Sequence, residues 1–190
     1  MDSSQPEDVD IGFDPLDVVE HVLSAENLEF DRTDDGDLAF ALAGDWKDYE
    51  LWFAWRPEAD CLQLCLSLDL RVAKGRRNAS HELLSLINQR IWLGHFEVWA
   101  EDGEVVFRHS LAVPTGERPT IAQAASMIDA AVEAADRFFP AFDFLIRGAQ
   151  HQDRNRHRRK PQASPAVSNM QAAMASCGDL APFSRKSNAG

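Results

Sequence analysis

The sequence predicts an α+β fold in which an antiparallel sheet carries helices on one face, in the order helix, strands, helix, hairpin, long helix. Three patterns lead to this prediction. Residues 120–148 repeat apolar side chains every three or four positions, which indicates a long amphipathic helix. Residues 61–72 alternate apolar and polar side chains, which is typical of a strand with one buried face. Asp102-Gly103 separates two further alternating runs and indicates a hairpin.

The first part of the chain is predicted to contain a helix and three strands. Asp14-Pro15 offers an acidic N-cap followed by a proline at the first helical position. Strands are expected at residues 27–32, 38–43 and 47–56, because turn residues separate short apolar runs there. The apolar face expected for the helix consists of Leu16, Val19, Val22 and Leu23.

Residues 61–72 show the clearest strand pattern of the chain. Cys61 and Cys65 fall on the face that we expect to be wettable, about 13 Å apart at the usual strand rise, which is beyond disulfide reach. The side chains expected to face the core are Leu62, Leu64, Leu66, Leu68, Leu70 and Val72.

The hairpin turn predicts a register for its two strands. If Asp102-Gly103 forms a two-residue turn, paired residues have numbers that sum to 205. This register places Phe96 opposite His109. It also places Glu97 opposite Arg108, as an ion pair on the solvent side of the sheet.

Two further helices are expected. One covers residues 78–92, and the other covers residues 120–148. The long helix begins with a capping-box pattern, Thr120 with Gln123 three residues later. Pro140 lacks a backbone donor and clashes with the preceding turn, so we expect a kink there.

Composition divides the chain into three parts. We predict a disordered acidic N-terminus at residues 1–13, one folded domain at residues 14–148, and a disordered basic tail at residues 149–190. Residues 1–147 hold 29 Asp and Glu against 12 Lys and Arg, a net charge of −17, whereas residues 148–190 carry +5. A body this acidic repels nucleic acid and anionic lipid, so such a contact would have to use the tail.

The sequence indicates a cytoplasmic protein. Its first ten residues, MDSSQPEDVD, lack the apolar core of a signal peptide, and no run of about 18 apolar residues could form a membrane span. Three cysteines cannot form a framework of paired disulfides, which fits a reducing compartment.

Histidine placement argues against a metal site. His95 and His109 fall on opposite faces of the predicted hairpin, so one metal ion cannot bind both. His81-Glu82 resembles half of a zinc-protease motif, but Ser85 stands where the second histidine is required. We expect no metal and no cofactor.

Cys61 and Cys65 are the remaining candidates for reactive side chains. Neither has a histidine or basic residue nearby in sequence to lower its thiol pKa, so we interpret both as packed thiols and expect no catalytic residue and no enzyme. The alternative is a small-ligand sensor or enzyme with a pocket between helix and sheet near Cys61, Cys65 and His95.

Residues 47–56 place large apolar side chains on both faces of one strand. If helices cover only one face, the other is an exposed aromatic patch of the kind found at protein-partner or dimer surfaces. The alternative is that both faces are covered within the monomer. The two sets are Trp52 with Ala54, and Leu51 with Phe53 and Trp55.

The tail contains one strongly basic segment, residues 154–160. Such a segment can bind an anionic surface, but it lacks the interleaved aromatic residues that stack on bases. We do not expect nucleic-acid binding, and tail-mediated binding to nucleic acid or an anionic surface stays an alternative function. The candidate residues are Arg154, Arg156, Arg158, Arg159 and Lys160.

Several short motifs follow one another in a fixed order within residues 14–148. They are Asn88, Gly94-His95-Phe96, Val106-Phe107-Arg108 and Phe138-Phe139-Pro140-Ala141-Phe142. With the order of segments, they resemble the YbjN family of bacterial sensory transduction regulators. The resemblance implies a fold similar to type III secretion chaperones and a non-enzymatic, cytoplasmic, partner-binding regulator. The chain departs from the family after Phe144, where it becomes basic.

We therefore predict a chaperone-like or adaptor-like regulator of a sensory or stress pathway. It would bind a protein segment over its sheet or along the kinked long helix. The partner would be another protein or a second copy of the chain. The candidate contact residues are Trp52, Trp55, Phe138, Phe139 and Phe142.

Overall fold

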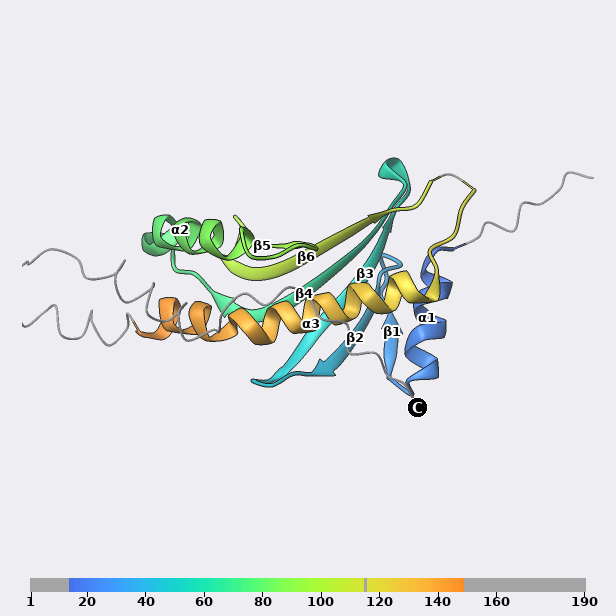
Figure 1. The fold of residues 1–190 in the computed structure, drawn as a ribbon, viewed down its shortest axis with the longest axis horizontal. Helices are drawn as coiled ribbons and strands as arrows, with labels where there is room; N and C mark the ends of the chain where they lie inside the picture. The colour runs from blue at the N-terminus through green and yellow to red at the C-terminus, as the bar shows by residue number, and fades with distance from the viewer. Residues whose placement is uncertain (1–13, 115, 149–190) are drawn as a thin grey trace, which may run out of the picture.

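A computed structural model describes residues 14–114 and 116–148 of the chain. They form a six-stranded antiparallel sheet of strand order β1-β2-β3-β4-β6-β5 with three α-helices, which confirms the predicted α+β class and segment order (Figure 1). The segments expected at residues 1–13 and 149–190 lie outside the described residues. The elements are α1 Leu16–Ala25, β1 Phe30–Arg32, β2 Leu38–Ala43, β3 Asp48–Arg56, β4 Cys61–Arg71, α2 Arg77–Asn88, β5 His95–Val98, β6 Glu104–Ala112 and α3 Ile121–Asp143.

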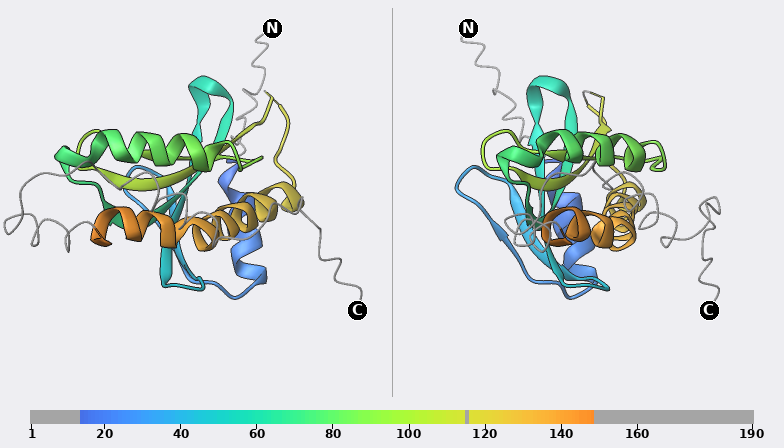
Figure 2. Two further views of the ribbon diagram at one scale, coloured as in Figure 1. Left: turned by 60° about the vertical axis from the view of Figure 1, so that its left-hand side comes forward. Right: turned by 90° about the vertical axis from the view of Figure 1, so that its left-hand side faces the viewer.

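The three helices bury their apolar residues in one core on one face of the sheet, which we call the inner face. α3 lies lengthwise over β4 and β6, and α1 packs across α3 and against β3 (Figures 1 and 2). No helix of the described residues packs on the opposite, outer face. The strands contribute the fully buried side chains Leu38, Leu51, Phe53, Leu62, Leu64, Leu66 and Phe107 to the core.

Side chains cap the starts of α1 and α3, as predicted. Asp14 Oδ1 accepts a hydrogen bond from the Leu16 amide at 2.9 Å. Thr120 Oγ1 accepts from the Gln123 amide at 3.1 Å, and Gln123 Oε1 accepts from the Thr120 amide at 2.8 Å, which completes the capping box. Each bond satisfies a backbone donor that has no partner within the helix.

The long helix is continuous at Pro140. α3 extends to Asp143, and a π-helical turn, Phe144–Gly148, follows it. The π-helical turn therefore begins four residues after the proline, while the expected bend at Pro140 stays a prediction.

β4 confirms the predicted alternation on its inner side but not on its outer side. Leu62 through Val72 alternate as buried residues facing the helices. On the outer side, Cys65 and Ser67 are only 3% and 5% exposed, so the expectation of a wettable face is wrong for these two residues. The reason is that Cys65 pairs with two residues whose side chains are large, Trp52 on β3 and Arg108 on β6.

The β5–β6 hairpin has a register two residues away from the predicted one. Phe96 pairs with Phe107 and not with His109, and the two phenylalanine rings meet edge to face at 5.2 Å. The connection is a four-residue loop that ends at Gly103, whose φ is +81°. The Trp99 amide donates to the Glu104 carbonyl at 2.9 Å and closes the loop.

A shift of two residues leaves each side chain of the hairpin on its predicted face, because the side-chain period of a strand is two. His95 and His109 therefore still lie on opposite faces. The predicted ion pair between Glu97 and Arg108 is also present, with 2.5 Å between Glu97 Oε1 and Arg108 Nη2. Its partners are diagonal neighbours in the observed register.

α2 ends at Asn88, four residues earlier than predicted. The Asn88 side chain binds the edge strand β5: its Oδ1 accepts from the Phe96 amide at 2.8 Å, and its Nδ2 donates to the Phe96 carbonyl at 3.0 Å. An amide side chain thus takes the place of a neighbouring strand at this residue. Gly94 precedes β5 with a φ of +73°, and a Cβ there would lie 2.4 Å from the Phe107 ring.

We expect Asn88→Ala to lower the free energy of unfolding by about 2 kcal/mol. The substitution leaves the buried amide and carbonyl of Phe96 without partners, and each unsatisfied group costs about 1 kcal/mol or more. Urea unfolding measures the change. Gln89→Ala, at the exposed neighbouring position, is the matched control; equal stability of the two variants would show that these edge bonds contribute nothing.

Candidate partner-binding surfaces

One row of paired residues crosses the outer face of the sheet. Buried small side chains surround this row: Ala54 and Val106 are 1% and 0% exposed, yet neither belongs to the core under the helices. Their own larger neighbours on the sheet must cover them. The row consists of Ala39, Trp52, Cys65, Arg108 and His95.

Trp52 and Trp99 form the aromatic part of the outer face, which we call the tryptophan pair. Their ring centroids are 5.9 Å apart in an edge-on arrangement, and both side chains are half-buried. Trp99 Nε1 donates to Glu97 Oε1 at 2.7 Å, and the same oxygen pairs with Arg108. The indole donor is therefore satisfied within the domain, and charged groups border the two rings.

The structure separates the predicted contact residues. Trp55 lies on the inner side of β3, packed against the core, so it does not share a surface with Trp52. Phe138 and Phe142 are 2% and 0% exposed and pack on Phe96 at centroid distances of 6.2 and 5.0 Å. The expectation that these two phenylalanines contact a partner is wrong, because the regular turn of α3 directs them into the core.

Phe139 belongs to a second aromatic group, at the place where the β2–β3 connection meets α3. We call Trp46, Tyr49 and Phe139 the aromatic corner. Trp46 stacks on Phe139 with 6.2 Å between centroids and 15° between planes, and Tyr49 contacts Phe139 at 6.4 Å. Tyr49 is fully buried, whereas Trp46 is 57% exposed. The corner thus has a buried base and an open indole ring.

Asp136 ties the aromatic corner to α3 through three hydrogen bonds. Its Oδ1 accepts from the Asp45 amide at 2.8 Å and from the Tyr49 hydroxyl at 2.9 Å. Its backbone carbonyl accepts from Trp46 Nε1 at 2.8 Å. That carbonyl lacks its usual helical donor because Pro140, four residues later, has no N–H. Burial, followed by the hydrogen bond to Asp136, raises the pKa of Tyr49 above its ordinary range.

The cysteines do not lie in a pocket between helix and sheet. Cys61, Cys65 and His95 are all on the outer face, away from the helices. Arg108 stands between Cys65 and His95, which are two strands and therefore about 10 Å apart. Burial, only partly offset by the charge of Arg108, raises the pKa of Cys65 to about 11. The thiol stays protonated at neutral pH, and the histidine is too far away to activate it.

The remaining titratable groups do not assemble into a metal site. His109 is half-buried on the inner side of β6, where burial lowers its pKa and its Nδ1 has no hydrogen-bond partner among the described residues. Within residues 14–114 and 116–148, no three His, Cys, Asp or Glu side chains are placed to hold a metal ion. In the same residues, no helix is long and apolar enough to cross a membrane.

Trp46, Trp99 and Asp136 were not among the contact residues predicted from the sequence. One signal could have indicated Asp136: the residue four positions before a proline inside a helix has a free carbonyl, and a buried carbonyl requires a donor. No local pattern could have named Trp46 as that donor, because 90 residues separate the two.

The basic candidates of the tail lie outside the described residues. Their role in binding an anionic surface therefore stays a prediction. They are Arg154, Arg156, Arg158, Arg159 and Lys160.

Comparison with known proteins assigns the chain to a class of bacterial regulators. It belongs to the YbjN family, described as "Putative bacterial sensory transduction regulator", whose family model matches residues 15–144. A similar solved structure is the crystal structure of YbjN from E. coli, described as "a putative transcription regulator". It is 15% identical, with a TM-score of 0.47, and the match covers 73% of this chain and 93% of that chain. No curated protein matches the chain.

We expect Asp136→Ala to lower the free energy of unfolding by about 3 kcal/mol. The buried Tyr49 hydroxyl and the Asp45 amide lose a charged acceptor, and such losses cost more than those of neutral pairs. Glu133→Ala, on the exposed side of the same helix, is the control and should change stability by less than about 0.5 kcal/mol. If the two variants unfold at the same urea concentration, Asp136 does not hold the corner.

Cys65 should react slowly with iodoacetamide in the native protein. A shift of the thiol pKa from 9.0 to about 11 lowers the thiolate fraction at pH 8 on the order of 100-fold relative to the urea-unfolded chain. Because the native pKa is raised, the stability that this burial contributes is present below pH 9 and is lost as the pH rises from 9 to 11. Peptide mass spectrometry measures the rate; equal rates in native and unfolded chains would contradict the burial argument.

Proposed function

We propose that this regulator acts by binding a protein partner on the outer face of its sheet. The observation that supports the proposal is the absence of any described helix from that face, combined with the tryptophan pair at its centre. Helices cover the inner face, where most of the large apolar strand residues are buried and the others, such as Trp55, are partly buried against the core. On the outer face, only the side chains of the sheet shield its small buried residues.

The outer face has the composition of a protein interface. Trp52, Trp99 and neighbouring alanines supply an apolar centre, and Glu97 with Arg108 supplies charges at its border. Tryptophan and arginine are enriched among the residues that dominate binding energy, whereas bulk hydrophobicity does not distinguish an interface. The hydrogen bond from Trp99 to Glu97 holds one ring in place, which lowers the entropy lost on binding.

Binding by addition of a strand is disfavoured at both edges of the sheet. At the β5 edge, Asn88 already occupies the amide and carbonyl of Phe96. At the other edge, β1 is only three residues long. Short or blocked edges prevent strand pairing with another chain. The proposal therefore concerns the face of the sheet and not its edges.

Trp52→Ala should weaken binding of the partner at least tenfold. The full-length chain would first be used to capture its partner from the bacterium that carries it, and the affinity would then be measured with purified components. Trp92→Ala is the matched control, since Trp92 is 81% exposed on the α2–β5 connection, outside the strands of the sheet.

A circular dichroism spectrum and a thermal midpoint confirm that each variant is folded. The control should change the affinity by less than twofold. A partner whose binding is lost with Trp92→Ala and kept with Trp52→Ala would contradict binding at the outer face.

A further inference from the structure

We infer that the aromatic corner binds the basic segment of the same chain, residues 154–160. This surface lies at α3, on the helix side of the molecule, and is distinct from the outer face. Three observations support the inference: an open indole ring, a stripe of carboxylates beside it, and a basic segment that begins within reach.

The indole ring of Trp46 offers a site for a guanidinium group. Phe139 covers one side of the ring, and the ring edge donates to the Asp136 carbonyl, yet the side chain is still 57% exposed. These contacts fix the ring in position before any ligand arrives. Arginine stacks on tryptophan faces more readily than other cations do, because its planar guanidinium is weakly hydrated.

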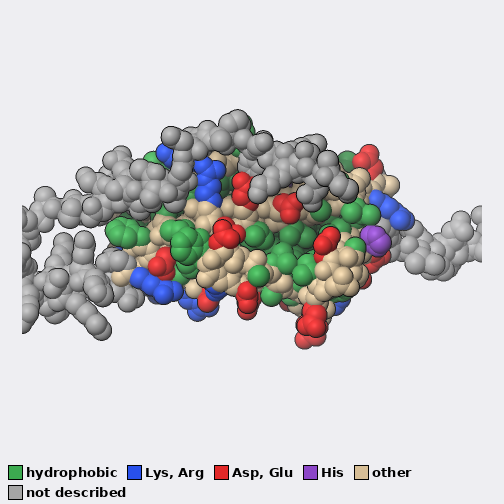
Figure 3. Space-filling model, turned by 60° about the horizontal axis from the view of Figure 1, so that its bottom comes forward, with side chains coloured by type: hydrophobic (Ala, Val, Ile, Leu, Met, Phe, Trp, Pro, Cys, Tyr) green, Lys and Arg blue, Asp and Glu red, His purple; other side chains and the backbone are tan. Residues whose placement is uncertain are grey.

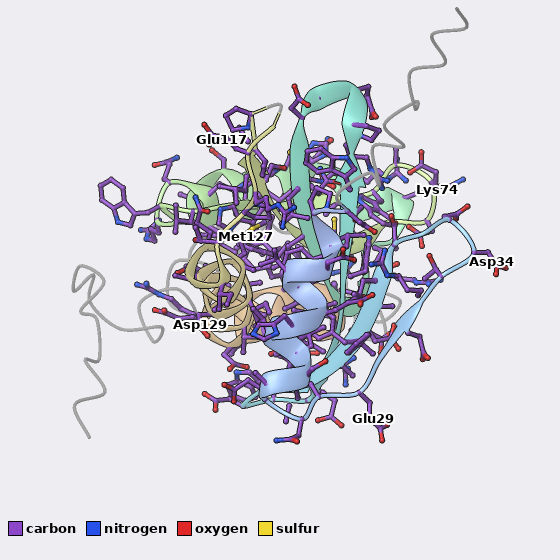
Figure 4. All side chains as sticks on the ribbon, turned by 90° about the vertical axis from the view of Figure 1, so that its right-hand side faces the viewer. Glu29, Asp34, Lys74, Glu117, Met127 and Asp129 are labelled. Carbon is purple, nitrogen blue, oxygen red and sulfur yellow. The ribbon has the colours of Figure 1, made fainter. Side chains whose placement is uncertain are left out.

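A stripe of carboxylates runs along α3 next to the aromatic corner. Asp129, Glu133, Asp136 and Asp143 are spaced by four, three and seven residues, which places all four within one side of the helix. Asp129 and Glu133 are exposed, and neither forms an ion pair with another described residue, whereas Asp143 is paired with Arg147 at 2.6 Å. Figure 4 shows Asp129 on the outer side of α3 and Met127 on the side toward the sheet.

The carboxylates and the aromatic corner are close enough to act together. Asp136 contacts both Trp46 and Tyr49, and Asp45 precedes Trp46 and is exposed. On the face of the molecule drawn in Figure 3, red carboxylates lie among green hydrophobic side chains. Aromatic faces attract cations and carboxylates form strong hydrogen bonds with guanidinium groups, so both kinds of group favour an arginine side chain.

The segment can reach this surface. Phe139 lies nine residues before Gly148, about 14 Å along a helix at 1.5 Å per residue. Residues 149–153 separate Gly148 from the segment, and six residue steps span up to about 20 Å when extended. Arg154 can therefore fold back over the aromatic corner, and the residues after it can follow the carboxylate stripe.

Charge and tethering both favour this occupant over a separate one. The segment holds five fixed positive charges in seven residues, and it belongs to a tail of +5 that faces a body of −17. A short linker holds the segment at an effective concentration in the millimolar range, so weak individual contacts suffice. Each contact is also screened by salt, which gives the inference a simple control.

Carbodiimide crosslinking of the full-length chain tests the contact directly. This reagent joins a lysine amine to a carboxylate only where the two touch, and Lys160 lies at the end of the segment. We expect Lys160 to crosslink to Asp129 or Glu133 in the monomer at low salt, and these products to fall at least fivefold in 1 M NaCl. Asp34 and Asp35, exposed in the β1–β2 turn, are the internal control and should not react.

A second measurement follows the aromatic ring. In a chain labelled with 5-fluorotryptophan, replacing the four arginines of the segment by glutamine should shift the Trp46 resonance, assigned through Trp46→Phe, and leave that of Trp92 unchanged. Asp129→Asn with Glu133→Gln should produce a shift in the same direction, whereas Asp34→Asn with Asp35→Asn should not.

Three results would overturn the inference. Lys160 could crosslink equally to Asp34 and to the α3 carboxylates, which would mean diffuse attraction without a site. Mixed ¹⁴N and ¹⁵N chains could give Lys160 crosslinks only between chains, which would mean that the occupant is a second copy. The Trp46 resonance could also be unchanged by the arginine substitutions, which would mean that the indole is not part of the site.

Discussion

The burial of α3 against a single sheet face is the constraint on which the rest of the structure depends. The helix supplies the apolar cover for β4 and β6, and α1 packs on the same helix. Phe138 and Phe142 meet Phe96 at the centre of this contact. All three helices pack on the inner face. On the outer face, only side chains of the sheet and its connections can therefore cover the buried residues. This explains why small side chains such as Ala54 and Val106 are buried although neither belongs to the core under the helices.

In this arrangement, some backbone groups at the sheet edge and within α3 have no backbone partner. Two side chains supply the missing hydrogen bonds. At the edge strand β5, Asn88 provides the donor and the acceptor that a further strand would provide. Within α3, Pro140 removes the donor for the Asp136 carbonyl, and Trp46 replaces it. In both places a side chain from another element bonds a backbone group that has no partner within its own helix or sheet, and such a group costs about 1–3 kcal/mol when it is buried and unsatisfied. Both residues therefore specify the tertiary arrangement as well as stabilise it.

The periodic elements could be predicted from the sequence, and the contacts between them could not. The inward leucines of β4 and the stripe of α3 follow from apolar spacing alone, and the capping box at Thr120 follows from two residue identities. The hairpin register failed because Asp102-Gly103 fits a two-residue turn locally, while the tertiary contacts of Phe96 and Trp99 favour a longer loop. For the candidate surfaces, the alternation of side chains along residues 47–56 identified Trp52. The position of Trp46 depends on its hydrogen bond to the Asp136 carbonyl, 90 residues away in sequence, which no local pattern predicts.

The core also determines where function can be located. Residues on the outward side of α3 and on the outer face of the sheet contribute little to the contact between helix and sheet. That contact therefore does not determine which residue types stand at these positions. The chain places a stripe of carboxylates on one of these surfaces and a tryptophan pair on the other. The exposed carboxylates of this stripe, Asp129 and Glu133, add little to folding stability, since even surface ion pairs contribute at most about 1 kcal/mol. Folding therefore does not require the exposed residues of these two surfaces, which leaves them available for the contacts that we propose.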